Sequence, residues 1–458
     1  MTITAARNSF VAPGRRLPSA LRLRPLAAAL ALSQLIDPSA MAGSTITASS
    51  GVNHVVTSCA DAAILPVCGP DDGTLRQAFN CAQDRDTVDL SQLQCSTITL
   101  AAPLTSGPVS LFLSGPGAES LKIEAGGAFR ALVHNGRPGD TLYVENVTIA
   151  NGHYENPYTY GGGGGCIFSS GNVYLGASIV TGCYASSVTT LATGGGIFAK
   201  GSVTLLASLV TGNTVKGQAD TKYASARGGG VYADTVKVYA STVSGNAAVS
   251  PTKTTYGGGV YAKNVIGKYA TISENSATSR AGVSAGTALT LTSSTISANV
   301  ARDFTGGAHL VNGTANLYNS TIAFNSAGAP QAVGGITAGA VHSESSIIAR
   351  NTAANAASDI AASADGNITG AHNLIMVSNV AVPQDTIRTD PQLGPLQDNG
   401  GLTWTHALRP SSPAVDGGAN PLANEYDQRF DIRQIGTATD IGAFELDELF
   451  AGNFEDPN

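Results

Sequence analysis

The central part of the chain, from about residue 145 to residue 375, is built from two short elements that alternate and recur. One is a Gly-Gly-Gly tripeptide followed by Ile or Val and an aromatic residue, at positions 194–198, 228–232 and 257–261. The other follows about 16 residues later and ends on an asparagine, at Asn213, Asn246, Asn275, Asn299, Asn325 and Asn351. These asparagines are 24 to 33 residues apart. Repeats of about 20 to 50 residues are typical of solenoids, in which each coil packs against its neighbours.

The coils are predicted to consist of strands. Within the repeats, short β-branched stretches alternate with Gly and Asn turns, and none has helical periodicity. This pattern favours an all-β, single-stranded parallel β-helix over a leucine-rich horseshoe. We expect Gly where the backbone turns sharply, and the six asparagines to bond one another in a ladder. A second column, formed by Phe168, Phe198, Tyr232 and Tyr261, is interpreted as a stacked structural ladder.

Residues 1–42 are predicted to be a signal peptide. Arginines precede a 12-residue apolar stretch at 25–36, and Ala40-Met41-Ala42 forms a cleavage site. Removing the segment takes away five Arg and one Asp, which leaves 20 basic and 31 acidic residues and a net charge of −11. We therefore expect no nucleic-acid partner. The chain has no apolar run of about 18 residues, so no transmembrane segment is expected.

The six cysteines favour an oxidising compartment and disulfide bonds. Four precede the repeats and could form two bridges there in any pairing: Cys59, Cys68, Cys81 and Cys95. Cys166 and Cys183 lie inside one repeat, and Cys183 stands where later repeats have asparagine. A bridge could therefore replace the asparagine in that coil. A zinc site is the alternative, but no pair has the C-x₂-C spacing.

The chain divides into five parts by composition. After the signal peptide, residues 43–135 are expected to form an N-terminal cap and the first coils, with a short amphipathic helix at 73–80 and disulfides pinning it. Residues 136–380 carry the β-helix repeats. Residues 381–446 are rich in Pro and Asp and are interpreted as a loop-rich C-terminal cap that covers the last coil. Residues 447–458 form a tail.

Several of these stretches resemble known families of exported bacterial proteins. The Gly-Gly element and the 320–325 stretch (Ser-Thr-Ile-Ala-Phe-Asn) resemble repeats of polymorphic outer membrane proteins. The 73–79 stretch is similar to a CSLREAI-type motif, with Gly73 and Thr74 in place of Cys and Ser. The C-terminal stretches 390–396, 398–403, 412–416, 427–429 and 440–445 are similar to the choice-of-anchor Q domain. The tail resembles one found on exported gammaproteobacterial proteins. The resemblances imply a right-handed, pectin-lyase-like β-helix, secreted or held at the cell surface or outer membrane.

A catalytic site is not favoured by the positions of the acidic residues. Polysaccharide lyases and glycoside hydrolases on such a fold need clustered carboxylates. The repeats from 161 to 351 hold five acids, which fall at different phases of the period: Asp220, Asp234, Glu274, Asp303 and Glu344. His309 and His342 are isolated and interpreted as structural or merely exposed. We therefore predict no catalytic residues, and keep a lyase or hydrolase as the alternative function.

The C-terminal aspartates could bind Ca²⁺, although Asp beside Gly and Pro more often bonds turn backbone. These residues are Asp398, Asp416, Asp427, Asp431 and Asp440. We interpret Asp427, Arg429 and Glu445 as a buried polar network. No cofactor is expected, and Ca²⁺ stays an open alternative.

A binding surface is predicted where the inter-coil loops lengthen, at 153–160, 214–227 and 247–256. Insertions at one phase of a solenoid map to one face. The candidate binding residues are Tyr154, Tyr158, Tyr160, Lys222, Tyr223, Arg227, Lys253 and Tyr256. These residues favour a non-catalytic role in adhesion, with a glycan or a surface protein as partner and the chain as a monomer. A passive spacer is a further alternative.

Overall fold

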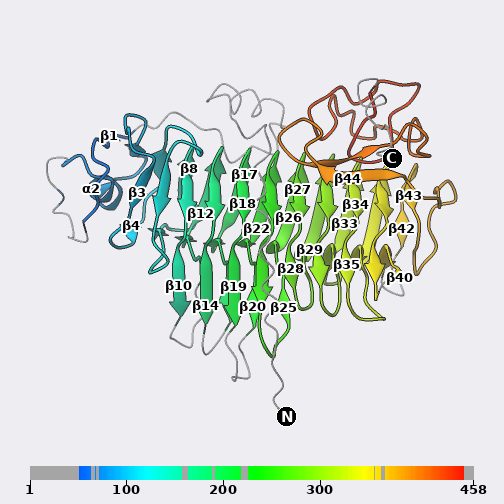
Figure 1. The fold of residues 1–458 in the computed structure, drawn as a ribbon, viewed down its shortest axis with the longest axis horizontal. Helices are drawn as coiled ribbons and strands as arrows, with labels where there is room; N and C mark the ends of the chain where they lie inside the picture. Colours follow the sequence, from blue (N-terminus) through cyan, green and yellow to red (C-terminus); the bar gives the residue numbers. More distant parts are fainter. Residues whose placement is uncertain are drawn as a thin grey trace, which may run out of the picture.

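The computed structural model describes residues 51–62, 68, 72–156, 163–187, 191–217, 225–354, 356–362 and 367–447. It confirms the predicted fold class: the chain is a parallel β-solenoid of about nine turns. Coils follow one another along the long axis, from β1 at one end to β43 at the other (Figure 1). Each coil pairs with the next in register, as in Ile197↔Val231.

The largest sheet has 20 strands and runs along the solenoid as two strips joined by two long strands. The first strip holds β4 (Leu104–Ser106), β7 (Leu132–His134), β11 (Ile167–Ser169), β16 (Ile197–Ala199), β21 (Val231–Tyr232), β32 (Ala308–Leu310), β36 (Ile336–Ala338) and β41 (Ile360–Ala362). The second holds β1 (Asn53–Val55), β2 (Thr87–Asp89), β5 (Leu111–Ser114), β8 (Thr141–Glu145), β12 (Asn172–Gly176), β17 (Ser202–Leu206), β22 (Thr235–Tyr239), β33 (Thr314–Tyr318), β37 (Ala340–Glu344) and β42 (Ile368–Thr369). The joining strands are β26 (Val260–Lys268) and β29 (Val283–Thr292).

Three further sheets complete the coils and a two-stranded sheet follows them. The 11-stranded sheet holds β3 (Thr97–Thr99), β6 (Lys122–Glu124), β9 (Thr148–Ala150), β13 (Ile179–Thr181), β18 (Leu209–Thr211), β23 (Thr242–Ser244), β27 (Thr271–Ser273), β30 (Thr295–Ser297), β34 (Thr321–Ala323), β38 (Ile347–Ala349) and β43 (Leu374–Ile375). The nine-stranded sheet holds β10 (His153–Asn156), β14 (Tyr184–Ser187), β19 (Thr214–Gly217), β24 (Ala247–Val249), β28 (Ser276–Ala277), β31 (Val300–Ala301), β35 (Ser326–Ala327), β39 (Thr352–Ala353) and β40 (Ala356–Ala357). The small sheets hold β15 (Ala192–Thr193), β20 (Ala226–Arg227) and β25 (Thr255–Tyr256), then β44 (Leu393–Gln397) and β45 (Thr405–Leu408).

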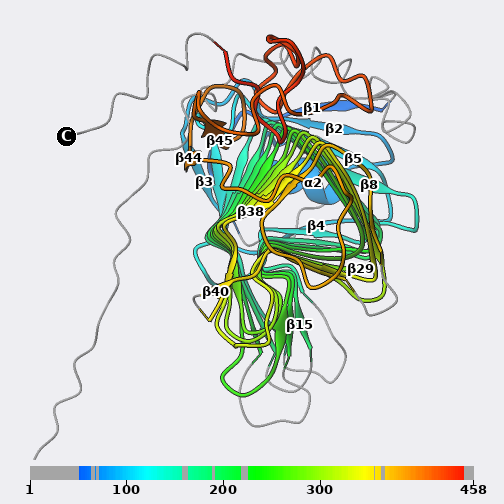
Figure 2. The same cartoon turned by 90° about the vertical axis from the view of Figure 1, so that its right-hand side faces the viewer.

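The cross-section of the solenoid has two lobes. The view along the axis shows a large lobe, which carries β4, β29 and β38, and a narrower one, which carries β15 and β40 (Figure 2). The large lobe has a core of Leu, Ile and Val side chains. The narrow lobe is thin because its core consists almost entirely of alanine, as at Ala185, Ala226 and Ala248. The segments predicted as long loops contain the strands of this narrow lobe.

The Gly and Asn columns pack against each other inside the coil. A Cβ on Gly230 would lie 3.0 Å from Asn246 Cγ, and a Cβ on Gly259 would lie 2.8 Å from Asn275 Nδ2. The third Gly of each tripeptide is therefore required because an asparagine side chain fills the adjacent space. Each buried asparagine uses that space to bond the next, as Asn246 Nδ2 does with Asn275 Oδ1 at 3.0 Å.

One coil replaces this Gly–Asn pair with a disulfide. Cys166 precedes Ile167, which pairs with Ile197, so Cys166 aligns with the third Gly of the next coil, Gly196. Cys183 aligns with Asn213, whose Oδ1 accepts the backbone N–H of Cys183 at 3.0 Å. The two cysteines are bonded to each other. The bridge therefore occupies the volume that a glycine and an asparagine share elsewhere.

The N-terminal end is closed by α2 (Leu75–Cys81), which overlaps the helix predicted at 73–80. The Thr74 side chain accepts the Gln77 N–H and caps the first turn. Leu75 and Phe79 are fully buried at the start of the core. The four cysteines of this region pair as Cys59–Cys95 and Cys68–Cys81.

The C-terminal part differs from the predicted cap. Val380 and Val382 pack against the end of the main core, so a short segment does cover the last coil. The following chain turns back and lies along the outside of the 11-stranded sheet, above β27 to β43 (Figure 1). Gln428 Nε2 donates to Thr271 Oγ1 of β27 at 2.8 Å, and Ala443 N donates to Thr321 Oγ1 of β34 at 3.1 Å. A row of Ser and Thr hydroxyls on the outer face of this sheet provides hydrogen-bond partners for the C-terminal segment away from the last coil.

Among the described residues, no helix has the length and apolar character to cross a membrane. The predicted signal peptide and residues 448–458 of the tail lie outside the described residues.

Candidate functional site

The Gly-Gly-Gly tripeptide forms the corner at which the chain passes from the narrow lobe to the large lobe. It joins β20 to β21, and Gly228 adopts φ 69°. A Cβ at Gly228 would lie 3.0 Å from the Tyr232 Cβ, so only glycine lets the strand after the corner pack this closely. The corner therefore brings the residue before the tripeptide, Arg227, beside the aromatic residue after it.

The residues after the corner form the predicted aromatic column. Successive rings are stacked one coil apart, with centroids 5.4 Å apart for Phe168 and Phe198, 5.3 Å for Phe198 and Tyr232, and 5.2 Å for Tyr232 and Tyr261. Their planes lie within 8° of parallel. Because the ring faces are turned toward neighbouring rings or, at Phe168 and Tyr261, also toward an arginine, we infer that the column presents ring edges and, at its two tyrosines, hydroxyl groups.

The residues before the corner form a second column, which we call the arginine column. It consists of Thr193, Arg227, Tyr256, Arg280 and Thr305, each paired with the next in parallel register. The guanidinium carbon of Arg227 lies 5.0 Å from the Tyr261 ring centroid, and that of Arg280 lies 4.7 Å from the Tyr256 centroid. These distances are within the range of cation–π contacts. The arginine and aromatic columns together are named the aromatic–arginine face.

Burial determines the electrostatics of this face. Burial lowers the pKa of the Arg280 guanidinium, and the neighbouring positive charge of Arg227 lowers it further. Burial also raises the pKa of Tyr232, so its hydroxyl stays protonated. His309 stands in the register of the aromatic column, one coil beyond Ser284, and burial together with Arg280 lowers its pKa to about 3. His309 is therefore neutral at neutral pH, and the positive charge of the face comes from its arginines.

The four candidate binding residues that the structure describes do not all lie on this face. Arg227 and Tyr256 lie on the aromatic–arginine face. Tyr154 lies beside its N-terminal end, with its ring 3.3 Å from the Arg130 guanidinium carbon. Lys253 lies apart, in the turn between β24 and β25, where its N–H donates to Ser250 Oγ. The other four lie outside the described residues: Tyr158, Tyr160, Lys222 and Tyr223.

Sequence reasoning did not select Arg130 or Arg280. Arg280 stands two residues before Gly282, in a coil where the Gly-Gly-Gly tripeptide has become Ala281-Gly282, so the tripeptide motif does not mark its position. Aligning the coils on their asparagines would have placed it beside Tyr256. No glycine corner follows Arg130, whose Nη2 donates to the Gly163 carbonyl at 2.8 Å in the next coil.

A second aromatic cluster was also missed. Tyr143 stacks on Phe112 with centroids 4.3 Å apart and contacts Tyr174 at 5.5 Å. Leu206 and Tyr239 join it on the outer side of the 20-stranded sheet. Tyr174, Leu206 and Tyr239 are each at most 2% exposed, so these side chains pack within the structure and do not form an open surface.

Acidic side chains of the described coils do not gather at one place. Asp303 is paired with Arg302 on an exposed turn, and Glu344 is paired with His342. Asp220 lies outside the described residues. Within the described ranges, no three His, Cys, Asp or Glu side chains are placed to hold a metal ion.

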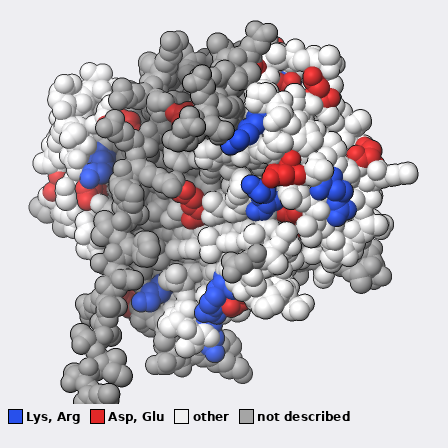
Figure 3. All heavy atoms as spheres, turned by 45° about the vertical axis from the view of Figure 1, so that its right-hand side comes forward, with Lys and Arg blue, Asp and Glu red and all other residues white. Residues whose placement is uncertain are grey.

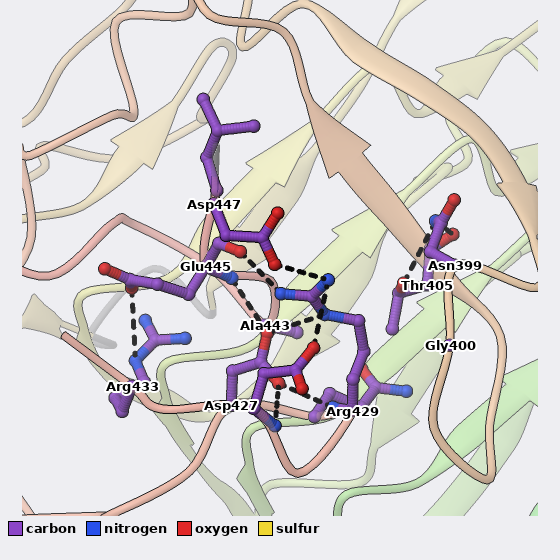
Figure 4. A network of polar contacts seen from close by, with 12 residues as sticks. Asn399, Gly400, Thr405, Asp427, Arg429, Arg433, Ala443, Glu445 and Asp447 are labelled. Atoms are coloured by element: carbon purple, nitrogen blue, oxygen red, sulfur yellow. Dashed lines mark hydrogen bonds and ion pairs between the residues drawn. The ribbon is translucent and has the colours of Figure 1, made fainter. Parts of the chain in front are cut away.

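The C-terminal segment holds a buried polar network (Figure 4). Asp427 accepts hydrogen bonds from Arg429 Nε at 2.9 Å and from Glu445 N at 3.0 Å. Arg433 Nη2 donates to the carbonyl oxygens of Asp440 and Gly442. These contacts tie three stretches of irregular chain together, which is a structural role.

Four of the five aspartates weighed as Ca²⁺ ligands accept backbone N–H groups, and Asp431 pairs with Arg429 at 3.2 Å. Asp398 accepts from Gly400, Asp416 from Ala438, and Asp440 from both Asp416 and Leu446. Burial raises the pKa of Glu445 to about 7, with the nearby Asp440 carboxylate as a further cause. The network therefore contains a group that titrates near neutral pH.

Comparison of the chain with protein-family models, with curated proteins and with solved structures finds no match.

Proposed function

We propose that this chain is an exported β-helix protein that binds a glycan, without cleaving it, at the aromatic–arginine face. One observation carries the proposal: tyrosine and arginine side chains are concentrated, half-buried, along one corner of a solenoid that is otherwise poor in charge. Only 12% of the residues are charged. On the side shown in Figure 3 the described charged side chains occur in small, separate groups, with uncharged surface between them.

Tyrosine and arginine are the residue types that most often dominate binding energies at protein surfaces. Here they are fixed before any ligand arrives, because Tyr232 and Tyr261 stand on strands and Arg227 lies over the Tyr261 ring. Preorganised side chains lose little conformational entropy on binding. The two columns run across successive coils, with different residues in each coil, so a ligand with an extended structure can contact several coils at once. A polysaccharide has such a structure.

Export is supported by the three disulfide bonds, since disulfides persist in oxidising compartments. The predicted signal peptide and the resemblance to polymorphic outer membrane protein repeats and the choice-of-anchor Q domain add to this part of the proposal. Under it, the chain acts outside the cytoplasm, at the cell surface or after release, as an adhesion or glycan-binding protein.

A glycan array probed with residues 43–458 tests the proposal. We expect binding to a subset of glycans, lost in Tyr232→Ala and Tyr261→Ala and kept in Tyr426→Ala, which removes a tyrosine from the C-terminal segment. Thermal unfolding would show that the variants fold. Absence of binding to every glycan, or equal loss in the Tyr426 variant, would contradict the proposal.

The non-catalytic part has its own test. Residues 43–458 are incubated with pectate, alginate and similar polymers, with and without Ca²⁺. We expect no new reducing or unsaturated ends. Release of such ends faster than in a heat-inactivated sample would show that the chain cleaves the polymer and would contradict the non-catalytic role.

A further inference from the structure

The two arginines of the arginine column stand on either side of one aromatic ring. In the register of the coils, Tyr256 pairs with Arg227 on one side and with Arg280 on the other. Its ring centroid lies 5.8 Å from the Arg227 guanidinium carbon and 4.7 Å from that of Arg280. The two positive charges are close enough that Arg227 lowers the pKa of Arg280. The fold therefore keeps two like charges together.

The described part of the chain does not balance these charges with acids. Neither Arg227 nor Arg280 forms an ion pair with a described carboxylate. The Nε of each is buried and has no hydrogen-bond partner. Arg280 Nη1 contacts Ser284 Oγ at 3.5 Å, and the Arg227 side chain forms a hydrogen bond with Tyr232. A buried donor without a partner destabilises the fold, and an unfilled ion site is one of the usual reasons for its presence.

The pairing of the coils fixes the backbone positions of both arginines. Arg227 is a strand residue of β20, directly before the Gly228 corner, and Arg280 bridges to Thr305 in the next coil. The aromatic rings beside the two arginines supply cation–π attraction, which stabilises a guanidinium while leaving its N–H groups available. Arginine presents these groups in a planar fork that fits carboxylate and sulfate oxygens in pairs.

We propose that Arg227 and Arg280 form an anion site and that the glycan bound at this face is acidic, with carboxylate or sulfate groups on its sugars. This inference rests on the proposed function and specifies its ligand. Residues 43–458 as a whole repel polyanions, because their net charge is −11. Binding of an acidic glycan therefore depends on a local site, and its affinity falls as salt screens the charges.

Three polymers with one backbone test the inference: dextran, carboxymethyl dextran and dextran sulfate. Affinities of residues 43–458 are measured by biolayer interferometry at low and at physiological salt. We expect at least one charged polymer to bind roughly tenfold or more tightly than dextran. The comparison between the two charged polymers identifies carboxylate or sulfate as the preferred group.

Variants assign the effect to the two arginines. Arg227→Gln and Arg280→Gln are each expected to lose roughly tenfold in affinity for the charged polymer, and Arg280→Lys less, because it keeps the charge without the fork. Arg302→Gln is the matched control, since Arg302 is exposed and paired with Asp303. Equal affinities for Arg280→Gln and Arg302→Gln, with both folded, would overturn the inference.

The outcomes separate this inference from the proposed function. If dextran binds as well as the charged polymers and Tyr261→Ala abolishes binding, the result contradicts the anion site and supports the proposed glycan binding. If no polymer binds and the array is also empty, both fall. If poly-glutamate binds as tightly as the charged dextrans, the ligand is an acidic protein segment and the assignment to a glycan is overturned.

Discussion

The side-chain amide of Asn246 donates a hydrogen bond to Asn275 Oδ1 at 3.0 Å, and the same oxygen accepts the Asn246 backbone N–H, also at 3.0 Å. This two-bond link repeats from coil to coil with both residues fully buried. The column ends at Asp359, whose Oδ1 accepts both the backbone and the amide N–H of Asn351. The asparagines thus satisfy buried backbone groups that the turn leaves without partners.

Asn275→Ala is predicted to lower the free energy of unfolding by about 3 kcal/mol. The change leaves the Asn246 N–H and the Val243 carbonyl, both bonded by Asn275, without their partners inside the core. Unfolding by urea, followed by circular dichroism, measures the loss. Asn264→Ala is the control, because Asn264 lies on the outer side of β26. Equal urea midpoints for the two variants would show that the asparagine ladder contributes nothing to the free energy of unfolding.

The disulfide coil is predicted to accept the Gly–Asn pair of the other coils. Breaking the Cys166–Cys183 bridge with Cys166→Gly and Cys183→Ala is expected to cost about 3 kcal/mol. In Cys166→Gly with Cys183→Asn the new amide can accept the Gly152 N–H, which now bonds the Cys166 sulfur. This variant should recover about 1 kcal/mol or more of the loss. Equal denaturation midpoints for the two double variants would contradict the equivalence of the pairs.

The C-terminal network is predicted to make stability depend on pH. Burial raises the pKa of Glu445 to about 7, so the folded chain holds this proton more tightly than the unfolded chain. Its contribution to stability is complete below the ordinary glutamate pKa of 4.5 and is lost as the pH rises through about 7. Thermal unfolding between pH 5 and 8 should show a fall in midpoint that Glu445→Gln reduces. An unchanged slope in the variant would exclude Glu445 as its source.

Gln428 is predicted to hold the C-terminal segment on the solenoid. Its side chain is buried and bonds Thr295 Oγ1 at 2.7 Å and Thr271 Oγ1 at 2.8 Å, on two successive coils. Gln428→Ala leaves these hydroxyls without that partner. Limited proteolysis should then cut within residues 391–446 faster, several-fold or more, while the coils stay intact. Gln434→Ala, at an exposed position, serves as the control, and equal cleavage of both variants would contradict this role.

The solenoid could be predicted from the sequence because its determinants are local. The Gly-Gly-Gly tripeptide before Tyr232 and the asparagine at 246 recur from coil to coil. Each determines the packing of its own coil and of the next. The helix observed at 75–81 was likewise predicted, at 73–80, from its local apolar pattern.

The position of the C-terminal segment could not be predicted, because it depends on contacts between residues far apart in the sequence. Gln428 bonds Thr271 across 157 residues, and no local pattern encodes such a pairing. Only part of the candidate site was predicted from the sequence, because the rest also depends on contacts between coils. Arg227 and Tyr256 lie in the lengthened segments, whereas Arg280 lies in a coil without such an insertion and joins them only through the stacking of coils.

Hydrogen-exchange mass spectrometry of residues 43–458, with and without a glycan selected on the array, tests the central claim most directly. The account predicts protection in the segments around residues 226–232, 255–261 and 280–284, which approach one another only at the aromatic–arginine face. Protection confined to the C-terminal segment 391–446, or spread evenly over the outer side of the 11-stranded sheet, would contradict it.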